Sequence, residues 1–346
     1  MMESAHAHRK DEHLAITEAN IRKGGLNTNF NDLRIIHHGL PEINVADTDI
    51  SVALPDFKLP VPFYIEAMTG GSLRTGQINA QLAKVAKETQ LAMAVGSQSI
   101  TLKDKSSYES FEVVRKLNPD GFILANLGAG KSAQDAQFAV DLINANALEI
   151  HINAAQEIVM PEGDRDFMWL DNIASIVNSV NVPIIVKEVG FGISQTTLNK
   201  LAAIGVKYVN VGGRGGTNFA AIENQRNHKT NYDFMLDWGQ TTLESLIEGQ
   251  LSPTDITLFA TGGINNPLDI LKSQILGAKM TGVAGHFLHT LLSKKEHGLI
   301  DEILTWQTQL HELYALVGAR NQTELTQIEY ILSPQLANYQ QQRIIK

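Results

Sequence analysis

Eight short apolar runs recur along the chain, most of them at intervals of roughly 25–35 residues, and they limit the possible folds more than any other feature. Each run is short enough to be one strand, and its successive apolar residues are typical of a strand that is covered on both faces of a parallel sheet. The runs are 63–67, 91–95, 122–125, 148–151, 184–187, 208–211, 257–260 and 280–283.

Helix-length segments lie between most of these runs. In residues 77–89, Ile78, Leu82, Val85 and Ala86 have the spacing of one helix face. Residues 132–146, 171–179 and 198–204 have similar patterns, and the last is followed by Gly205, a typical helix stop. Eight alternating strand–helix units predict an α/β fold of the (β/α)₈ barrel type. A doubly wound open sheet is the alternative, but it rarely needs eight such even units.

We expect one domain over residues 1–346, since no low-complexity linker interrupts the chain. Residues 1–60 form an N-terminal extension, residues 60–295 the barrel, and residues 296–346 a C-terminal segment that includes an amphipathic helix over 299–317. The gap after the sixth run is longer, about 45 residues, and predicts a mobile flap over the active site.

Composition excludes several classes of function. The chain has no Cys, which rules out disulfides, thiolate metal sites and a Cys nucleophile, and which fits a cytoplasmic location. No signal-peptide pattern and no membrane-spanning apolar stretch are present, so we expect no membrane partner. The formal net charge of −9 argues against nucleic acid as a partner, and any anionic ligand must be held by a local cluster.

The stretch from His151 to Glu157 places polar chemistry directly after an apolar run. In a parallel barrel, catalytic groups gather at the C-terminal ends of the strands. If the strand continues through His151 and Asn153, both side chains share a face, and Gln156 and Glu157 follow in a loop. The first two can hydrogen-bond phosphate, and Glu157 can anchor Mg²⁺. The alternative is a strand end with a satisfied His and a capping Asn.

Small residues at the other strand ends would let a phosphorylated ligand approach the backbone. After the seventh and eighth runs we expect backbone amides to bind phosphate. The residues concerned are Gly262, Gly263, Ala284 and Gly285. Polar groups at the same mouth complete a ring that suits flavin mononucleotide (FMN). That ring consists of Thr69, Ser97, Asn126 and Lys187.

Lys187 ends a run of Ile and Val, where an unpaired ammonium is costly to bury. It could form a Schiff base, balance an anionic ligand, or pair with Glu188 or Glu66. Near the start of the chain, Arg9, Lys10 and His13 form either a solvated charged tail or a basic arm that grips a diphosphate. The charged stretch 161–167 could add carboxylates near Mg²⁺, but we favour a turn for its Glu162 and Asp164.

Taken together, these motifs resemble the type 2, flavin-dependent isopentenyl-diphosphate delta-isomerases, from residue 9 to about residue 290. The stretch from His151 to Phe167 is the most specific part of the likeness. The motifs are Arg9-Lys10-x-x-His13, Met68-Thr-Gly-Gly71, Gly96-Ser-Gln98, His151-x-Asn153-x-x-Gln156-Glu157, Pro161-Glu-Gly-Asp-Arg-Asp-Phe167, Lys187-Glu-Val-Gly190, Gly212-Gly-Arg-Gly-Gly-Thr217 and Ala260-Thr-Gly-Gly263.

The resemblance implies interconversion of isopentenyl diphosphate and dimethylallyl diphosphate in isoprenoid biosynthesis, with reduced FMN, Mg²⁺ and NAD(P)H as reductant. It implies a homotetramer or homo-octamer, Glu157 as the metal ligand, and Lys187, Gln156 and His151 as catalytic residues. FMN would be held by Ala67, Met68, Thr69, Ser97, Asn126, Lys187, Thr217, Gly262, Gly263, Ala284 and Gly285. Substrate would be held by Arg9, Lys10, His13, His151, Asn153 and Gln156.

One position departs from the family pattern. Many members have Arg after Gly-Ser-Gln, where this chain has Ser99, and Arg74 is one candidate for the replacement cation. Our mechanistic hypothesis is that reduced FMN donates and accepts the proton, that Lys187 stabilises negative charge on the ring, and that the neutral Gln156 positions the substrate.

Two other functions compete with this interpretation. One is an FMN-dependent 2-hydroxy acid oxidase or dehydrogenase, for which His286 would be the catalytic base. In that case the Arg9–Lys10 pair and Glu157 have no role. The other is a purely binding barrel, which would not need Lys187, His151 and Glu157 to converge.

Overall fold

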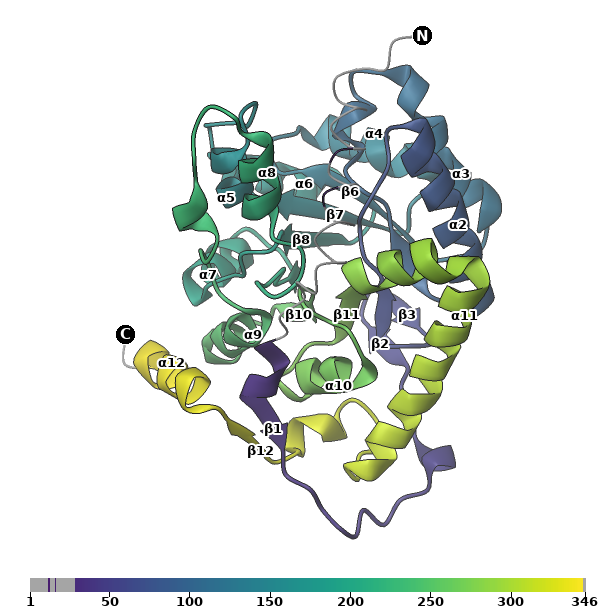
Figure 1. The fold of residues 1–346 in the computed structure, drawn as a ribbon, viewed down its shortest axis with the longest axis vertical. Coiled ribbons are helices and arrows are strands. Elements are labelled where there is room, and N and C mark those ends of the chain that lie inside the picture. Colours follow the sequence, from purple (N-terminus) through teal and green to yellow (C-terminus); the bar gives the residue numbers. More distant parts are fainter. Residues whose placement is uncertain (1–11, 13–15, 17–28, 345–346) are drawn as a thin grey trace.

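The computed structural model of the protein describes residues 12, 16 and 29–344. In that part of the chain, eight parallel strands close into a barrel, each pairing with the next along the chain and the last with the first (Figure 1). All eight coincide with the predicted runs, so the predicted barrel is confirmed. They are β4 (Phe63–Ile65), β5 (Ala92–Ala94), β6 (Ile123–Gly128), β7 (Ala147–Ile152), β8 (Ile184–Glu188), β9 (Tyr208–Asn210), β10 (Thr257–Ala260) and β11 (Met280–Val283).

Helices surround the strands, and capping side chains explain where several of them begin. Ser72 and Ser132 each accept a hydrogen bond from the backbone N–H three residues later, at the starts of α2 and α4. All four helices predicted from periodicity overlap observed ones. The surrounding helices are α2 (Leu73–Thr89), α3 (Glu109–Leu117), α4 (Ala133–Ile143), α6 (Leu170–Ser179), α7 (Gln195–Ala203), α9 (Thr242–Leu251), α10 (Pro267–Ile275) and α11 (Gly285–Leu316).

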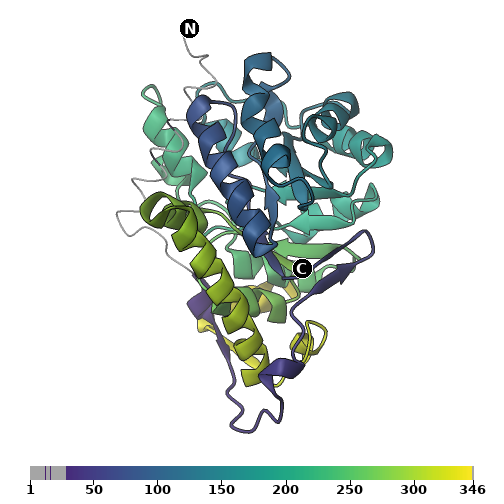
Figure 2. The same cartoon turned by 90° about the vertical axis from the view of Figure 1, so that its right-hand side faces the viewer.

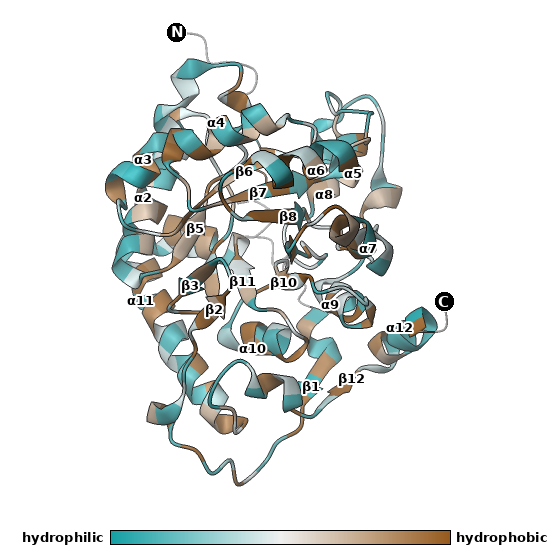
Figure 3. Cartoon of the chain, turned by 180° about the vertical axis from the view of Figure 1, so that it is seen from behind, coloured by the Kyte–Doolittle hydropathy of each residue, from teal (hydrophilic) through white to brown (hydrophobic). Residues whose placement is uncertain are grey.

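The hydrophobic core has two layers. One lies between the strands and the helices, and the other fills the barrel interior, where Tyr64, Leu124, Ile185 and Phe259 are almost fully buried. Figure 3 shows the corresponding hydropathy pattern, with hydrophobic strands at the centre and hydrophilic residues on the outer faces of the helices. The filled interior leaves the C-terminal ends of the strands as the open end of the barrel.

The N-terminal extension packs against the barrel and pairs with the C-terminal segment. Strands β2 (Val52–Leu54) and β3 (Phe57–Leu59) form a hairpin whose Phe57 ring packs 5.0 Å from that of Phe122, and whose Val52 and Leu59 join the interior layer. The hairpin therefore closes the bottom of the barrel. Strand β1 (Leu33–Ile35) pairs antiparallel with β12 (Tyr330–Leu332), which joins the extension to the C-terminal segment.

The predicted boundary at residue 296 falls inside one helix. Helix α11 begins at Gly285 as the eighth barrel helix and continues to Leu316, with a non-helical backbone at Lys295 (φ 65°). Its later part packs against α2 (Figure 2) and covers the predicted amphipathic range 299–317 except for its last residue. The final helix is α12 (Pro334–Ile344). Among the described residues, no helix is long and apolar enough to cross a membrane.

The long connection after β9 contains helix α8 (Phe219–Arg226) and a 3₁₀ turn (Asp233–Met235) before α9 begins. Helix α8 packs against the short helix α5 (Ala154–Val159), which follows β7 (Figure 1). This contact places the inserted segment beside the open end of the barrel. Its predicted mobility stays a prediction.

Candidate active site

A cavity of about 660 Å³ lies at the C-terminal ends of the barrel strands, a size typical of small-molecule sites. The structure brings together in its lining every predicted site residue that it describes, although their roles stay predictions. These are Ala67, Met68, Thr69, Ser97, Asn126, His151, Asn153, Gln156, Glu157, Lys187, Thr217, Gly262, Gly263, Ala284 and Gly285. Arg9, Lys10 and His13 lie outside the described residues.

The loop predicted for Gln156 and Glu157 is wrong, because both residues belong to helix α5. The strand ends at Ile152, and Asn153 stands at the start of the helix, where the sequence Ala-Ala-Gln-Glu favours helix formation. Asn153 Nδ2 donates to Gln156 Oε1 at 3.1 Å and to Glu157 Oε1 at 2.9 Å. The helix therefore holds the three polar groups together on the cavity wall.

Two residues that sequence reasoning missed fix Gln156 from the other side. Gln156 Nε2 donates to Glu223 Oε1 at 2.9 Å, and the fully buried Glu223 also pairs with Arg226, both in α8. Because its oxygen faces Asn153 and its nitrogen faces a carboxylate, the amide has one preferred orientation. The available signal was the polar stretch 223–228, which lies inside the long gap after the sixth run.

Arg226 also joins segments that are distant in sequence. It binds Glu162 at 2.9 Å and Glu12 at 3.1 Å, in addition to Glu223. Glu162 belongs to the 161–167 stretch, whose Asp164 backbone N–H donates to Glu157 Oε2 at 2.6 Å. The stretch is thus a turn folded back on the end of α5, as favoured from the sequence, and it lines the cavity.

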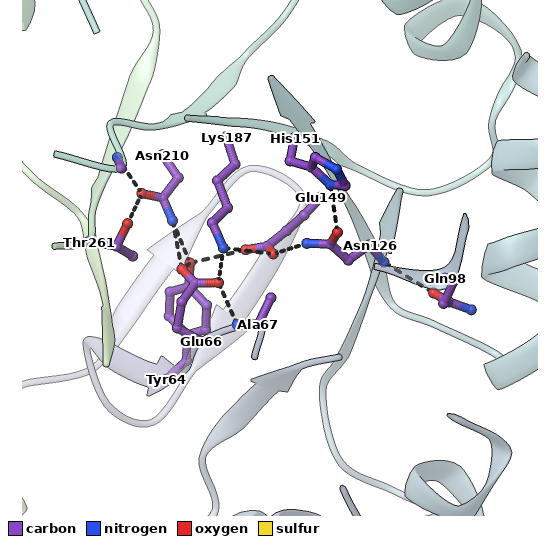
Figure 4. A network of polar contacts seen from close by, with 11 residues as sticks. Tyr64, Glu66, Ala67, Gln98, Asn126, Glu149, His151, Lys187, Asn210 and Thr261 are labelled. Atoms are coloured by element: carbon purple, nitrogen blue, oxygen red, sulfur yellow. Dashed lines mark hydrogen bonds and ion pairs between the residues drawn. The ribbon is translucent and has the colours of Figure 1, made fainter. Parts of the chain in front are cut away.

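Beneath the cavity lies a network that we call the floor cluster, drawn in Figure 4. Lys187 Nζ lies 2.6 Å from Glu66 Oε1 and 3.7 Å from Glu149 Oε2. Burial lowers the pKa of Lys187, but the two carboxylates outweigh it and the net shift is upward. Lys187 is therefore a charged, paired lysine rather than a Schiff-base nucleophile. The cluster consists of Tyr64, Glu66, Asn126, Glu149, Lys187 and Asn210.

Of the two partners considered from the sequence, Glu66 is the one that Lys187 uses. Glu188 instead accepts a hydrogen bond from the backbone N–H of Phe191 at 2.6 Å, and burial raises its pKa well above the usual range. Glu149 was not singled out as a site residue, although a Glu inside the apolar stretch 147–150 was a visible signal.

The same network orients His151. Asn126 Nδ2 donates to Glu149 at 2.9 Å, so its Oδ1 is the atom that faces His151 Nδ1, also at 2.9 Å. An amide oxygen only accepts, so Nδ1 carries the hydrogen, and in the neutral ring the lone pair is on Nε2. The nearby Gly128 leaves room for that nitrogen, since a Cβ there would approach it to 3.2 Å.

The opposite side of the cavity fits a phosphate group. Helix α11 begins at Gly285 with no side-chain cap at Ala284, and both residues line the cavity. The uncapped amides of a helix start attract anions. Gly262 has φ +104°, and a Cβ there would overlap the carbonyl oxygen of Gly213. These glycines form a close-fitting backbone cradle, so the residues fit the phosphate of a flavin mononucleotide.

The cations around the cavity differ from the sequence expectation. Arg74 stands at the exposed start of α2 and is not part of the lining, whereas Lys103 and Lys131 are. Ser99 lines the cavity together with these two lysines. His286, the base required for a hydroxy-acid oxidase, is bonded through Nε2 to Glu302 and stacks 5.1 Å from the ring of Trp306.

No group of three or more potential metal ligands occurs among the described residues. Glu157 is the one residue predicted to hold Mg²⁺, and a single protein carboxylate fits a metal held mostly by phosphate oxygens of a ligand. Both of its oxygens already accept a hydrogen bond, and a carboxylate oxygen has a second lone pair for a cation.

Comparison with solved structures supports the fold. The chain is similar to the recombinant flavin-binding domain of baker's yeast flavocytochrome b2, with a TM-score of 0.64 at 18% identity, covering 92% of this chain and 78% of that one. It is also similar to mandelate oxidase with (S)-2-phenylpropionate, with a TM-score of 0.64 at 12% identity, covering 92% and 98%. At these identities the likeness concerns the fold alone.

Sequence comparison is more specific. Residues 109–331 match the family described as FMN-dependent dehydrogenase. The chain is 50% identical to the isopentenyl-diphosphate delta-isomerase of Limosilactobacillus reuteri over 100% of both chains. It is 49% identical to that of Latilactobacillus sakei, over 99% of this chain and 97% of the relative, and 44% identical to that of Staphylococcus aureus, over 97% and 96%. The chain therefore belongs to the type 2, FMN-dependent family of isopentenyl-diphosphate delta-isomerases.

Proposed function

We propose that the protein interconverts isopentenyl diphosphate and dimethylallyl diphosphate. The observation that carries this proposal is the full-length similarity to named isomerases, at 44–50% identity. The cavity agrees with it, since it combines a phosphate cradle with polar side chains from α5 on the opposite wall. The 2-hydroxy acid oxidase alternative rests on distant neighbours of the same fold, at 12–18% identity.

FMN is the cofactor that we assign to the cavity, with its phosphate at Gly262, Gly263, Ala284 and Gly285. The ring would lie against Ala67, Met68, Thr69, Ser97 and Asn126, with Lys187 and Thr217 completing the site. When bound and reduced, FMN supplies an electron-rich surface and exchangeable protons beside the substrate carbon atoms. NAD(P)H is the proposed reductant.

The substrate diphosphate would be bound by His151 and Asn153 together with Mg²⁺ on Glu157. Arg9, Lys10 and His13 would add positive charge from the N-terminal arm. Gln156 would position the alkene, because its amide is held by Asn153 and Glu223 and cannot rotate freely. Below the floor cluster, apolar side chains fill the barrel interior, so water cannot enter the cavity from that side.

We further propose a cytoplasmic location and a homotetramer or homo-octamer. Size-exclusion chromatography with light scattering would measure the mass of the assembly. A monomer at micromolar concentration would contradict the proposed oligomer.

The direct test of function is anaerobic proton NMR of isopentenyl diphosphate with the protein, FMN, Mg²⁺ and NADPH. We expect dimethylallyl diphosphate to form, and none to form when the reductant is omitted. A reduced, bound flavin that gives no conversion, but is rapidly reduced by a 2-hydroxy acid, would support the oxidase alternative instead.

A further inference from the structure

The floor cluster contains two carboxylates for one ammonium. Glu66 follows β4, Glu149 belongs to β7 and Lys187 to β8, and their exposed fractions are 2%, 0% and 7%. Figure 4 shows the three side chains pointing toward one another. Glu66 and Lys187 line the cavity, whereas Glu149 lies below it. If both carboxylates were ionised, the cluster would have a net charge of −1 with almost no access to water.

The two carboxylates are not equally supplied with hydrogen-bond donors. Glu66 receives Lys187 Nζ and the backbone N–H of Ala67, both at 2.6 Å, and Asn210 Nδ2 at 2.9 Å. Glu149 receives Asn126 Nδ2 at 2.9 Å, while Lys187 lies at 3.7 Å. The single hydroxyl hydrogen of Tyr64 lies within reach of both, at 2.9 Å from Glu66 and 3.2 Å from Glu149. Donors therefore stabilise the ionised form of Glu66 far better than that of Glu149.

Apart from Lys187, the groups bonded to the two carboxylates carry no positive charge, and His151 joins the cluster through Asn126 Oδ1. Tyr64 stays neutral, because burial and then the charges of the two carboxylates raise its pKa well above the usual range. Asn126 from β6 and Asn210 from β9 do not titrate. Deeper in the barrel, Tyr208 donates to Asp56 and not to the cluster. A buried, uncompensated carboxylate is unfavourable, so the site is balanced by a proton.

We propose that Glu149 holds a proton at neutral pH, that Glu66 is the ionised partner of Lys187, and that the two carboxyl groups are positioning residues that keep the floor of the flavin site electrically neutral. Burial, followed by the charge of Glu66, raises the pKa of Glu149 to about 8, which agrees with the geometry. Loss of this proton would place a net negative charge directly beneath the cavity.

This charge would have two effects. It would draw Lys187 away from Glu66 toward Glu149, since the two carboxylates then compete for one ammonium. It would also disfavour electron uptake by a flavin bound above, so that reduction becomes harder as the proton leaves. The second effect rests on the proposed function, because it requires that the cavity binds FMN; the protonation of Glu149 does not.

The first experiment tests the proton itself, without the cofactor. An infrared pH titration of the apoprotein should show a protonated carboxylic acid band at neutral pH that disappears as the pH rises through about 8. Glu188 is also buried with a raised pKa, so a protonated-acid band from it is expected in every variant. The component that disappears near pH 8 should be absent from Glu149→Gln and present in Glu248→Gln, a control that removes a buried carboxylate paired with Arg343 and outside the cavity lining. Absence of this component from the unmodified chain, or its persistence in Glu149→Gln, would overturn the proposal.

The second experiment tests the effect on the cofactor. The midpoint potential of bound FMN is measured from pH 6 to 10 in the unmodified protein, in Glu149→Gln and in Glu248→Gln. We expect the midpoint potentials of the unmodified protein and of the Glu248→Gln control to become lower than that of Glu149→Gln as the pH rises through about 8. At lower pH, all three potentials should agree. Parallel curves over the whole range would refute the role of Glu149 in setting the flavin potential. Failure of all three to bind FMN would instead contradict the proposed function and leave the infrared result valid.

Discussion

At the scale of single residues, the site depends on polar groups whose orientation is set by a hydrogen-bonding neighbour. Glu223 can only accept, so the Gln156 nitrogen faces it. Asn126 donates to Glu149, so its oxygen faces His151. Gln156 and His151 therefore each have a preferred hydrogen-bonding direction before any ligand arrives, which is what preorganisation requires.

Replacing Gln156 by Ala should lower kcat by about 10²-fold, the size of effect that loss of positioning gives. The fold and FMN binding should be kept, because Gln156 lies on the α5 wall and not in the phosphate cradle. Steady-state NMR kinetics measure the effect. Gln137→Ala, on the outer helix α4, is the control and should retain full activity. A fully active Gln156→Ala enzyme would contradict the positioning role.

The raised pKa of Glu149 also predicts how stability depends on pH. The pKa of this carboxyl is near the ordinary 4.5 in the unfolded chain and about 8 in the folded protein, so the unfolded state loses its proton first as pH rises. Relative to Glu149→Gln, the unmodified protein should therefore lose stability between pH 4.5 and about 8 and change little outside that window. Urea unfolding of both proteins across this range provides the measurement; a constant difference would contradict it.

At the scale of elements, the phosphate cradle depends on a glycine turn after β10 and on the start of α11. Gly262 and Gly263 both have positive φ, at +104° and +80°, and each lies against the backbone of the 212–217 loop. Close backbone packing and left-handed conformations are both required there, and only glycine supplies both. The turn is thus specified by its packing as well as by its conformation.

This gives a prediction with a matched control. Gly277 has nearly the same φ, +102°, but a Cβ there would meet nothing within 4 Å. Gly277→Ala should therefore cost only the conformational strain, about 1–2 kcal/mol, and keep FMN. Gly262→Ala should in addition displace the 212–217 loop and abolish FMN binding. Flavin fluorescence titration and thermal unfolding distinguish the two; equal FMN affinity in both variants would count against the cradle.

At the scale of the whole molecule, the inserted segment after β9 is tied to distant parts of the chain through one guanidinium. Arg226 binds Glu12 near the N-terminus, Glu162 after α5 and Glu223 within α8. The contacts come together only at the open end of the barrel. Any ligand that orders one of these segments should therefore stabilise the others.

Limited proteolysis checks this coupling. We expect isopentenyl diphosphate with Mg²⁺ to slow cleavage within residues 213–230 of the reduced holoenzyme. Arg226→Ala should be cut faster in this segment without substrate, because three contacts are lost. Arg320→Ala, which removes an exposed pair with Glu324, should be cut like the unmodified protein. Identical cleavage with and without substrate would argue against ordering of the segment.

The sequence by itself determined the barrel and most of the cavity. Eight apolar runs with helical segments between them allow few folds, and the C-terminal ends of parallel strands meet at one end of a closed barrel. That is why His151, Lys187 and the late glycines could be expected at one site from their positions alone. The loop predicted for Gln156 and Glu157 was wrong for a local reason. Residues 154–159 are helical because they are good helix formers that follow a capping position.

Only the tertiary structure decided which polar groups meet. Glu66, Glu149 and Lys187 come from three strands, and nothing in their spacing indicates that two carboxylates share one ammonium. The same holds for Glu223 and Gln156, which are 67 residues apart. Hydrophobic periodicity is a local property that survives in a linear chain, whereas hydrogen-bond partners, burial and the resulting protonation states depend on which side chains the closed barrel brings within a few ångströms of one another.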